Sequence, residues 1–432
     1  MMRHHLRAAL VLLAAIPAGA FSRPVAAQQE ANPVNLFVAD LRYVHGVLSL
    51  GPPRKLTHDV GRNSQPSFTP DGRAVLFAAQ REGGQVDVYR TDLATGVETQ
   101  VTHTAENENS PTVQPDGRIM VIRWKPETLF REWGPYLYKP DGTADQPVLP
   151  GPDTVGYFAR ADAHTFAFMR PASRFRVALW DDRVKTMVDV DSPVAGLPPQ
   201  RVPGARAVSY TRTDSAGRNV IRRVELDSRR TSDVAPTLLG RTSHAWTARG
   251  VLLMGRGNAI YAMDPARGRT WRRLAAFQRG DLRNVTAYAV SSQGTRLVFY
   301  STLKVPLHVV LRDSLQAGRG ALEAVALVRR MASENRAAYE VSEGGITSVG
   351  TDWLAMGKAA EAVEVLSLAA ELFPRSPDAQ AQLADAYRKL GRNDAAAEHY
   401  RRALALNPRT TEAEKAAAAQ VEKALAETVT VH

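Results

Sequence analysis

The sequence predicts a multidomain chain in which an all-β six-bladed propeller is followed by an all-α array of helical repeats. A four-stranded pattern at residues 64–102 recurs after 45 residues, from Pro66 to Pro111, and a period of about 40–50 residues is typical of propeller blades. A different pattern, with a period of 34 residues, appears after residue 345. Proline is frequent before residue 306 and absent from residues 307–373, which indicates a boundary between the two parts.

The chain begins with the features of an export signal at residues 1–27. Two arginines precede a short apolar run at residues 8–16, and small residues at 18–20 or 25–27 offer two alternative cleavage sites. The run is shorter than the roughly 17–25 residues that span a bilayer. We therefore expect a periplasmic or secreted protein with no transmembrane segment after cleavage. Cleavage after residue 27 would remove three arginines and no acid, lowering the formal charge from +11 to +8.

Composition excludes several classes of site. The chain has no cysteine, so it cannot hold a thiol nucleophile, a cysteine zinc site or a cysteine-bound iron–sulfur cluster. Arginines gather at residues 218–230 and 267–273. We interpret them mainly as solvated blade edges that prevent sheets from pairing with one another, with contact to anionic lipid or polysaccharide as the alternative. Predicted export disfavours nucleic acid as a partner.

The segment at residues 64–102 reads as one complete antiparallel blade. Its first turn, at residues 69–72, is Thr-Pro-Asp-Gly, in which Pro, Asp and Gly each favour a tight turn. The following strand contains Val75, Leu76 and Phe77 in succession, as expected for a strand buried on both faces. Turns at Gly83-Gly84 and at residues 94–96 then separate the third and fourth strands.

Further blades follow with weaker sequence agreement. Copies of the pattern occur at residues 110–123, 161–181, 205–227 and 246–268. The last copy, at residues 289–300, lacks its third and fourth strands, whereas residues 35–41 and 54–57 at the start of the chain resemble those missing strands. We therefore expect a propeller at residues 33–303 with five whole blades and a sixth made from both of its ends. A ring closed in this way has no free edge along its circumference.

These residues resemble the TolB-like six-bladed propellers built from PD40 repeats, which are relatives of WD40 repeats. The shared motif is Pro-x-Phe-Ser/Thr-Pro-Asp-Gly, then an apolar strand, then Tyr-x-x-Asp and a Thr-Gly turn. The match is close at residues 64–102 and good at 110–123, whereas Gln293 replaces the turn Asp in the last copy. At the level of the fold, the resemblance implies a protein that binds other molecules.

The helical part is expected in two sections. Residues 304–344 are predicted as a linker with one helix at 321–332, and residues 301–311 could add a stray strand. Residues 345–428 are predicted as repeats with a capping helix. Seven positions recur after 34 residues: Gly350, Trp353, Gly357, Ala362, Leu366, Ala369 and Pro374 correspond to Ala384, Tyr387, Gly391, Ala396, Tyr400, Ala403 and Pro408. This spacing resembles the tetratricopeptide repeat.

The tetratricopeptide resemblance implies a concave face lined by the first helix of each repeat. The matching positions are Thr347, Thr351 and Leu354, then Ala381, Asp385 and Arg388. Thr347, Thr351, Asp385 and Arg388 are the candidate binding residues. The Lys and Asn with which some family members hold a terminal carboxylate are missing from this set, so carboxylate capture is not expected there. Asp385 and Arg388 lie one helical turn apart, and we expect them to pair with each other in preference to a ligand.

The sequence contains no recognisable catalytic motif. It lacks a Gly-x-Ser-x-Gly elbow, a His-Glu-x-x-His pair, a phosphate loop and a calcium loop, so no catalytic residue, metal or cofactor is expected. His58 and His103 occupy equivalent repeat positions and are interpreted as structural. Asp59, Glu106 and Glu108 are placed on loops near the channel rim, where carboxylates could serve a lyase or glycosidase, although solvated loop acids are commoner.

The favoured interpretation is an exported, non-enzymatic interaction scaffold of the bacterial cell envelope. It would bind a protein or peptide partner through the propeller face and the groove of the helical repeats. The alternative is a glycan-binding protein, or an envelope hydrolase or lyase, with its site in the propeller channel. A fused serine hydrolase domain is excluded because the residues after the propeller are helical and too few.

Overall fold

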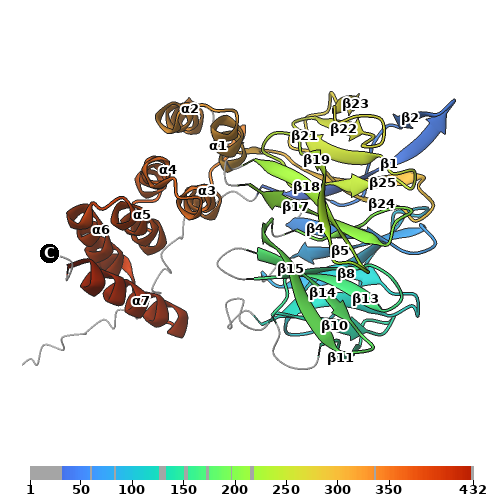
Figure 1. Cartoon of the computed structure of the whole chain (residues 1–432), viewed down its shortest axis with the longest axis horizontal. Helices are drawn as coiled ribbons and strands as arrows, with labels where there is room; N and C mark the ends of the chain where they lie inside the picture. The colour runs from blue at the N-terminus through green and yellow to red at the C-terminus, as the bar shows by residue number, and fades with distance from the viewer. Residues whose placement is uncertain are drawn as a thin grey trace, which may run out of the picture. The chain divides into compact units, whose positions relative to one another are not determined.

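The computed structural model describes residues 32–58, 61–81, 84–125, 133–149, 154–171, 175–195, 197–214, 218–334 and 337–429. The predicted export signal at residues 1–27 lies outside them. Strands make up the first part of the described chain and helices make up the last part (Figure 1). The predicted fold class, an all-β part followed by an all-α part, is therefore confirmed.

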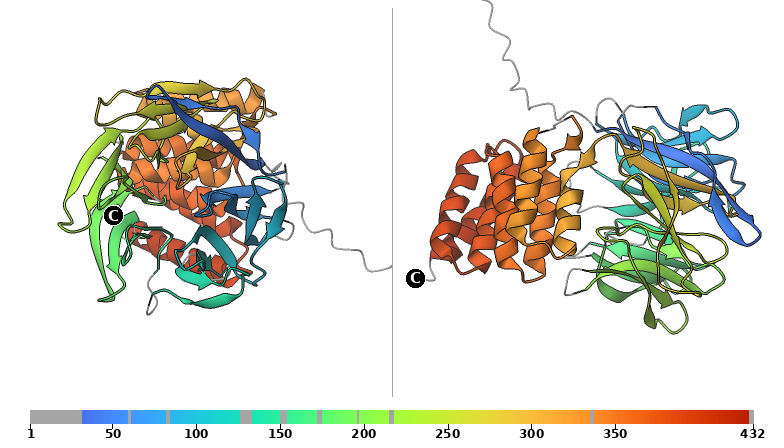
Figure 2. Two further views of the ribbon diagram at one scale, coloured as in Figure 1. Left: turned by 90° about the vertical axis from the view of Figure 1, so that its right-hand side faces the viewer. Right: turned by 90° about the horizontal axis from the view of Figure 1, so that it is seen from above.

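The strands form six antiparallel blades arranged as a ring (Figure 2, left). Blade 1 contains β4 (Arg62–Phe68), β5 (Ala74–Gln80), β6 (Val86–Asp92) and β7 (Glu98–Gln100). Blade 2 contains β8 (Asn107–Val113), β9 (Ile119–Trp124), β10 (Gly134–Tyr138) and β11 (Ala144–Pro147). Blade 3 contains β12 (Tyr157–Arg160), β13 (Thr165–Arg170), β14 (Phe175–Asp181) and β15 (Thr186–Val194).

The remaining blades follow the same order from the inner to the outer strand. Blade 4 contains β16 (Gln200–Arg201), β17 (Ala207–Thr213), β18 (Asn219–Glu225) and β19 (Thr231–Pro236). Blade 5 contains β20 (Ala245–Trp246), β21 (Leu252–Arg256), β22 (Ala259–Met263) and β23 (Arg272–Ala276). Blade 6 contains β24 (Thr286–Val290) and β25 (Arg296–Thr302), completed by β1 (Val34–Val44) with β2 (Val47–Leu50) and β3 (Arg54–Lys55).

Blade 6 is assembled from the two ends of the propeller. β1 pairs antiparallel with β25, from Val34 opposite Thr302 to Asp40 opposite Arg296. On its other side, β1 pairs with β3, and its far end forms a hairpin with β2. β1 also meets blade 1, where Val34 faces Arg62 in a parallel pairing. The first strand of the chain therefore supplies the third strand of the last blade.

The turn between the first two strands of a blade has a recurrent backbone geometry. In blade 1, Thr69 N donates to Ala74 O at 2.9 Å and Gly72 N donates to Thr69 O at 2.8 Å. Equivalent pairs of bonds close the turns that begin at Gln114 in blade 2, Thr247 in blade 5 and Ser291 in blade 6. Gly72 has a φ of 67°, which glycine adopts without strain. The turn therefore persists in blades 5 and 6, which lack the Pro-Asp-Gly motif.

The apolar core of the propeller is divided into separate clusters rather than forming one continuous core. One cluster joins blades 5 and 6 around Phe37, Phe277 and Phe299. Phe37 and Phe277 each stack on Phe299 with ring centroids 5.6 Å apart. Such aromatic contacts tie the amino-terminal strand to its neighbours.

The helical part consists of successive helix pairs and a final helix. Within the described residues the helices are α1 (Leu307–Gln316), α2 (Ala321–Glu334), α3 (Glu343–Ala355), α4 (Ala359–Leu372), α5 (Pro377–Lys389), α6 (Asn393–Leu406) and α7 (Glu412–Val429). α1 packs with α2, α3 with α4, and α5 with α6, while α7 packs on α6 (Figure 1). Ser342 and Ser376 cap α3 and α5, because their hydroxyls accept from Gly345 N and Ala379 N.

Residues 304–344 differ from the predicted linker, because they contain two helices. The stray strand expected at residues 301–311 is reduced to β26 (Val305–Pro306), which pairs with β27 (Tyr339–Glu340). α1 follows at once and buries Leu307, Leu311 and Leu315 on one face. A four-residue spacing of leucines is typical of a helix, and it outweighs the strand preference of the adjacent valines.

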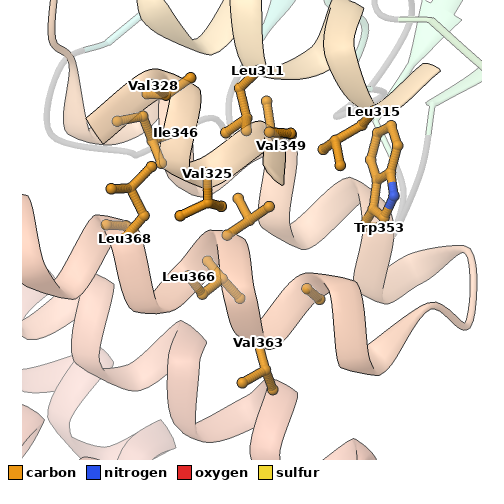
Figure 3. Packing of buried hydrophobic residues seen from close by; sticks show 14 of the residues in the cluster. Leu311, Leu315, Val325, Val328, Ile346, Val349, Trp353, Val363, Leu366 and Leu368 are labelled. Carbon is orange, nitrogen blue, oxygen red and sulfur yellow. The ribbon is translucent and has the colours of Figure 1, made fainter. Parts of the chain in front are cut away.

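The first helix pair shares one apolar core with the helices that follow. Leu311 and Leu315 of α1 and Val325 and Val328 of α2 pack in the same cluster as residues of α3, α4 and α5 (Figure 3). Trp353 of α3 lies in this cluster and is nearly buried. The helical array therefore begins at α1 and extends further toward the propeller than the 34-residue repeat indicated.

Candidate functional site

A pocket of about 500 Å³ lies where the inner strands of the propeller meet α1. The propeller and the helices belong to one compact unit, Asn32–His432. The lining residues on which the site depends are Arg62, Ser64, Tyr157, Arg241, Asn284, Thr286, Tyr288, Tyr300, His308, Arg312 and Glu340. They come from blades 1, 3 and 6, from the segment before blade 5, and from the start of the helical array. A volume of this size is typical of a small-molecule or peptide site.

Asp313 fixes α1 to the propeller at the edge of this pocket. Its carboxylate lies 3.4 Å from the guanidinium of Arg256 and 3.7 Å from that of Arg241. One turn further along α1, Gln316 Oε1 accepts from Gly240 N at 2.9 Å. Gly240 has a φ of 72°, and a Cβ there would lie 1.5 Å from Asp313 Oδ1, so only glycine fits this contact.

The opposite wall is held by Asn32. Its Nδ2 donates to Glu340 Oε2 at 2.6 Å and to Lys304 O at 3.0 Å, while its Oδ1 accepts from Lys304 N at 2.8 Å. Through these bonds, Asn32, two residues before β1, joins β27 to the end of the propeller. Glu340 is therefore already engaged on its side of the pocket.

Three arginines give the pocket its charge. Arg62 is exposed and has no ion pair within the described residues. Arg241 has a side chain that is 12% exposed, and its buried Nε has no hydrogen-bond partner. Arg312 lies 3.7 Å from Asp352. Glu340 is the one carboxylate among the described lining residues, so the lining carries more positive than negative charge.

His308 lies beside these arginines but adds no positive charge at neutral pH. Burial, together with the charges of Arg312, Arg62 and Arg241, lowers its pKa to about 4. Its Nδ1 is buried without a hydrogen-bond partner. It packs against Gly345 so closely that a Cβ there would lie 2.4 Å from Nδ1. A histidine that stays neutral is unsuited to exchange protons near pH 7.

Tyrosines form the apolar walls. The rings of Tyr288 and Tyr300 lie 6.0 Å apart at an angle of 50°, and Tyr157 lines the same pocket. Burial raises the pKa of each of the three phenols, so they stay neutral. Guanidinium groups beside aromatic rings can bind a ligand that has both an anionic group and an apolar part. They do not provide a nucleophile with an adjacent base.

The carboxylates predicted on the channel rim are placed differently. Glu108 lies on β8 and is 0% exposed, so its prediction as a loop residue is wrong. Blades 1 and 2 pack over it, and it accepts from Thr102 at 3.1 Å, from Tyr138 at 3.0 Å and from Thr104. Burial raises its pKa to about 7. No lining residue of the pocket takes part in this cluster.

Of the other two predicted rim acids, Glu106 forms an ion pair with Arg123 at 3.0 Å. Its backbone N donates to the hydroxyl of Thr104, which in turn donates to Glu108. Asp59 lies outside the described residues. No group of three or more potential metal ligands occurs in the part of the chain that the structure describes. Among the described helices, none is both long enough and apolar enough to cross a membrane.

The residues predicted on the first tetratricopeptide helix lie on α3. Thr347 is 5% exposed and its hydroxyl donates to Glu343 O at 3.0 Å. The hydroxyl of Thr351 donates to Thr347 O at 3.1 Å. Both hydroxyls are thus bonded within their own helix, and Thr347 offers little surface to a ligand.

The residues predicted on the second repeat lie on α5. Asp385 and Arg388 are 3.7 Å apart, and Arg388 also lies 3.3 Å from Glu427 of α7. Asp385 accepts from Tyr400 at 2.5 Å. These two side chains interact with each other and with neighbouring helices. The pocket arginines instead come from distant parts of the sequence, and no motif contains any of them, which is why sequence reasoning missed them.

Comparisons with known proteins find one sequence family and several solved structures that are similar to parts of this chain. Residues 377–409 match the tetratricopeptide repeat family, and the comparison with curated protein sequences finds no match. A solved structure assigned as TolB from Agrobacterium tumefaciens is similar over 63% of this chain and 99% of its own, with 15% identity and a TM-score of 0.49. TolB from Acinetobacter baumannii is similar over 62% and 64%, with 12% identity and a TM-score of 0.41.

An oligogalacturonate lyase solved in complex with manganese is also similar, over 58% of this chain and 80% of its own, with 15% identity and a TM-score of 0.40. Because these identities are low, the assignment of a propeller depends on the six blades observed in the structure. The second part of the chain is a helical array that contains a tetratricopeptide repeat at residues 377–409.

Proposed function

We propose that this chain is an exported, non-enzymatic interaction scaffold of the bacterial cell envelope, binding a protein or peptide partner through the propeller face and the adjoining helical repeats. The main observation behind this proposal is the pocket, in which three arginines and three tyrosines from the propeller and the helical array converge. Arginine and tyrosine are the residues that most often dominate protein–protein binding energy. Export rests on the sequence pattern at residues 1–27.

The ionisation states of the pocket residues support binding rather than catalysis. General acid–base catalysis needs a group that titrates near the working pH and reaches the substrate. His308 has a pKa lowered to about 4, and the tyrosines have raised pKa values. Glu108 has a pKa of about 7 but is 0% exposed and is not among the pocket-lining residues.

Site-specific photocrosslinking in the bacterial envelope tests the scaffold proposal. A photoreactive amino acid at Val309, which lines the pocket, is expected to give an adduct with one defined protein. The same amino acid at Val184, which is 63% exposed in the turn after β14, serves as the control. Absence of a protein adduct at Val309, or the same adducts at both positions, would contradict the proposal.

The mature amino terminus tests export independently. We expect the protein in the periplasmic or secreted fraction with residues 1–20 or 1–27 removed. An uncleaved chain in the cytoplasm would contradict the export proposal and leave the binding proposal standing.

A glycan-binding protein is the second candidate function, favoured by the tilted ring pair of Tyr288 and Tyr300 beside Arg62. Aromatic faces next to a cation suit an acidic sugar as well as a peptide. In the crosslinking experiment, adducts whose added mass is removed by glycosidases would favour this candidate.

A further inference from the structure

We propose that the pocket recognises an oxyanion, a carboxylate or phosphate group carried on a small organic ligand or ligand segment. This inference builds on the pocket of the proposed function and adds the chemical group that it selects. Three features of the pocket point to such a group: its excess of positive charge, the buried Nε of Arg241 without a hydrogen-bond partner, and the space beside the arginines.

The arginines present guanidinium groups that the protein itself does not neutralise fully. Arg62 has no ion pair within the described residues, and Arg241 has a buried Nε without a hydrogen-bond partner. Arg312 lies 3.7 Å from Asp352, which is beyond hydrogen-bond distance. A guanidinium is a planar fork of N–H donors that matches the two oxygens of a carboxylate or phosphate.

The acids near the pocket balance the charge of its arginines only in part. Asp313 lies between Arg241 and Arg256 and holds α1 in place. Glu340 accepts from Asn32. A buried cation without a full complement of hydrogen bonds is costly, and an oxyanion would supply the missing acceptors.

The space beside the charges fits an organic body rather than a bare ion. The pocket measures about 500 Å³, far more than the roughly 30 Å³ that one water occupies in the liquid. Tyr157, Tyr288 and Tyr300 supply aromatic surface, while Ser64, Asn284 and Thr286 supply neutral polar groups. We therefore expect a ligand with an anionic end and a ring or an apolar face.

Calorimetric titration of the purified full chain tests this proposal with three pairs of probes. The pairs are N-acetylphenylalanine and its amide, glucuronate and glucose, and phenyl phosphate and phenol. At least one anion is expected to bind at least about tenfold more tightly than its neutral counterpart, and its affinity is expected to fall as salt screens the charges. The pair with the largest difference identifies a peptide, a sugar or a phosphate source.

A matched pair of variants locates the binding. Arg62→Gln removes an exposed arginine of the pocket that has no ion pair, so folding should be retained, and the anion is expected to bind about tenfold more weakly. Arg269→Gln removes an exposed arginine in the turn between β22 and β23 that also lacks an ion pair in the described residues, and it should leave affinity unchanged.

Three outcomes would overturn the oxyanion proposal: no anion binds, each neutral probe binds as tightly as its anion, or Arg269→Gln weakens binding as much as Arg62→Gln. A protein adduct at Val309 together with any of these outcomes would leave the scaffold function intact and remove only the oxyanion chemistry. If no protein adduct forms at Val309 but an anion binds tightly, the oxyanion proposal would stand and the scaffold function would be contradicted.

Discussion

Two neighbouring joints of the propeller, the places where one blade packs on the next, contain the same kind of hydrogen bond from a backbone N–H to a threonine hydroxyl. They bury different side chains beside it. At the closing joint, between blades 6 and 1, Leu36 N donates to Thr57 Oγ1 at 3.0 Å. At the second joint, between blades 1 and 2, Val88 N donates to Thr102 Oγ1 at 2.9 Å. A threonine at the end of the fourth strand therefore fixes the third strand in both blades, although in blade 6 these strands come from the start of the chain.

The buried polar residue that the following blade contributes to each joint differs. At the closing joint, Asn63 Nδ2 donates to Val34 O at 2.8 Å. At the second joint, the residue 45 positions later is Glu108, which accepts from Thr102. Both are 0% exposed. The repeat therefore preserves the bond from a backbone N–H to a threonine hydroxyl, while the adjoining side chain varies between a neutral amide and a titratable acid.

The largest effect is expected from the aromatic residue in the third strand of each blade. Phe37 is opposite Phe299, and Tyr89 is opposite Phe77, but Phe37 is 0% exposed and Tyr89 is half-buried. Phe37→Ala should lower the free energy of unfolding by about 3–5 kcal/mol, and Tyr89→Ala by about 1–2 kcal/mol. Urea denaturation measures both. Equal losses of unfolding free energy in the two variants would mean that the stability of the propeller depends on β1 no more than on β6.

The next largest effect is a dependence of stability on pH, expected at the second joint because it contains the titratable Glu108. Burial raises the pKa of Glu108 to about 7 from 4.5, so the folded state favours its protonated form. The corresponding stability is fully present below about pH 4.5 and is lost as pH rises through about 7, on the order of 3 kcal/mol in total. Urea denaturation between pH 4 and 8 measures this loss.

Glu108→Gln is the control for this pH dependence, because it keeps the size of the side chain and cannot ionise. The difference in unfolding free energy between the wild-type chain and this variant should shift in favour of the variant as pH rises from about 4.5 to about 7. A difference that stays constant over that range would show that Glu108 does not change its charge on unfolding.

Replacing the two threonines should give a smaller difference between the joints. Thr57→Val removes the acceptor for Leu36 N and should cost about 1–2 kcal/mol. Each threonine also donates a hydrogen bond, Thr57 to the neutral amide of Asn35 and Thr102 to Glu108. Because a bond to a charged carboxylate is worth more, Thr102→Val should cost about 1 kcal/mol more than Thr57→Val at pH 8. Thermal and urea unfolding measure both. A larger loss for Thr57→Val would contradict this account of the second joint.

The smallest effect is expected beside the closing joint. Arg62 begins β4 but is exposed and has no ion pair within the described residues. Arg62→Gln should therefore change the free energy of unfolding by less than about 0.5 kcal/mol. A loss of 2 kcal/mol or more would assign Arg62 a structural role and weaken its assignment to ligand binding.

Local sequence patterns predicted much of the fold. The turn at residues 69–72 and its copies indicated blades, because each contains residues that favour a specific backbone geometry. The 34-residue spacing indicated the tetratricopeptide repeat, matched at residues 377–409. α1 was missed because its leucine stripe, from Leu307 to Leu315, lies in a segment with neighbouring valines and no repeat partner.

The candidate site was largely invisible to the same reasoning. Arg62, Arg241 and Arg312 are far apart in the sequence and converge only when blade 1, the segment before blade 5 and α1 come together. Glu108 was read as a solvated acid because burial by an adjacent blade leaves no periodic signal. Its equivalent 45 residues earlier, Asn63, lies before the strand that the sequence predicted from Pro66, so the repeat did not place Glu108 on a strand either.

Hydrogen exchange of the full chain, with and without the partner captured at Val309, tests the central claim most directly. If the pocket holds the partner, backbone amides of β4, β24 and α1 should exchange more slowly in the complex, while those of β11 and β19 on the outer edges should be unchanged. Slower exchange confined to α5–α7 or to the outer strands would contradict the claim that the partner binds at the pocket.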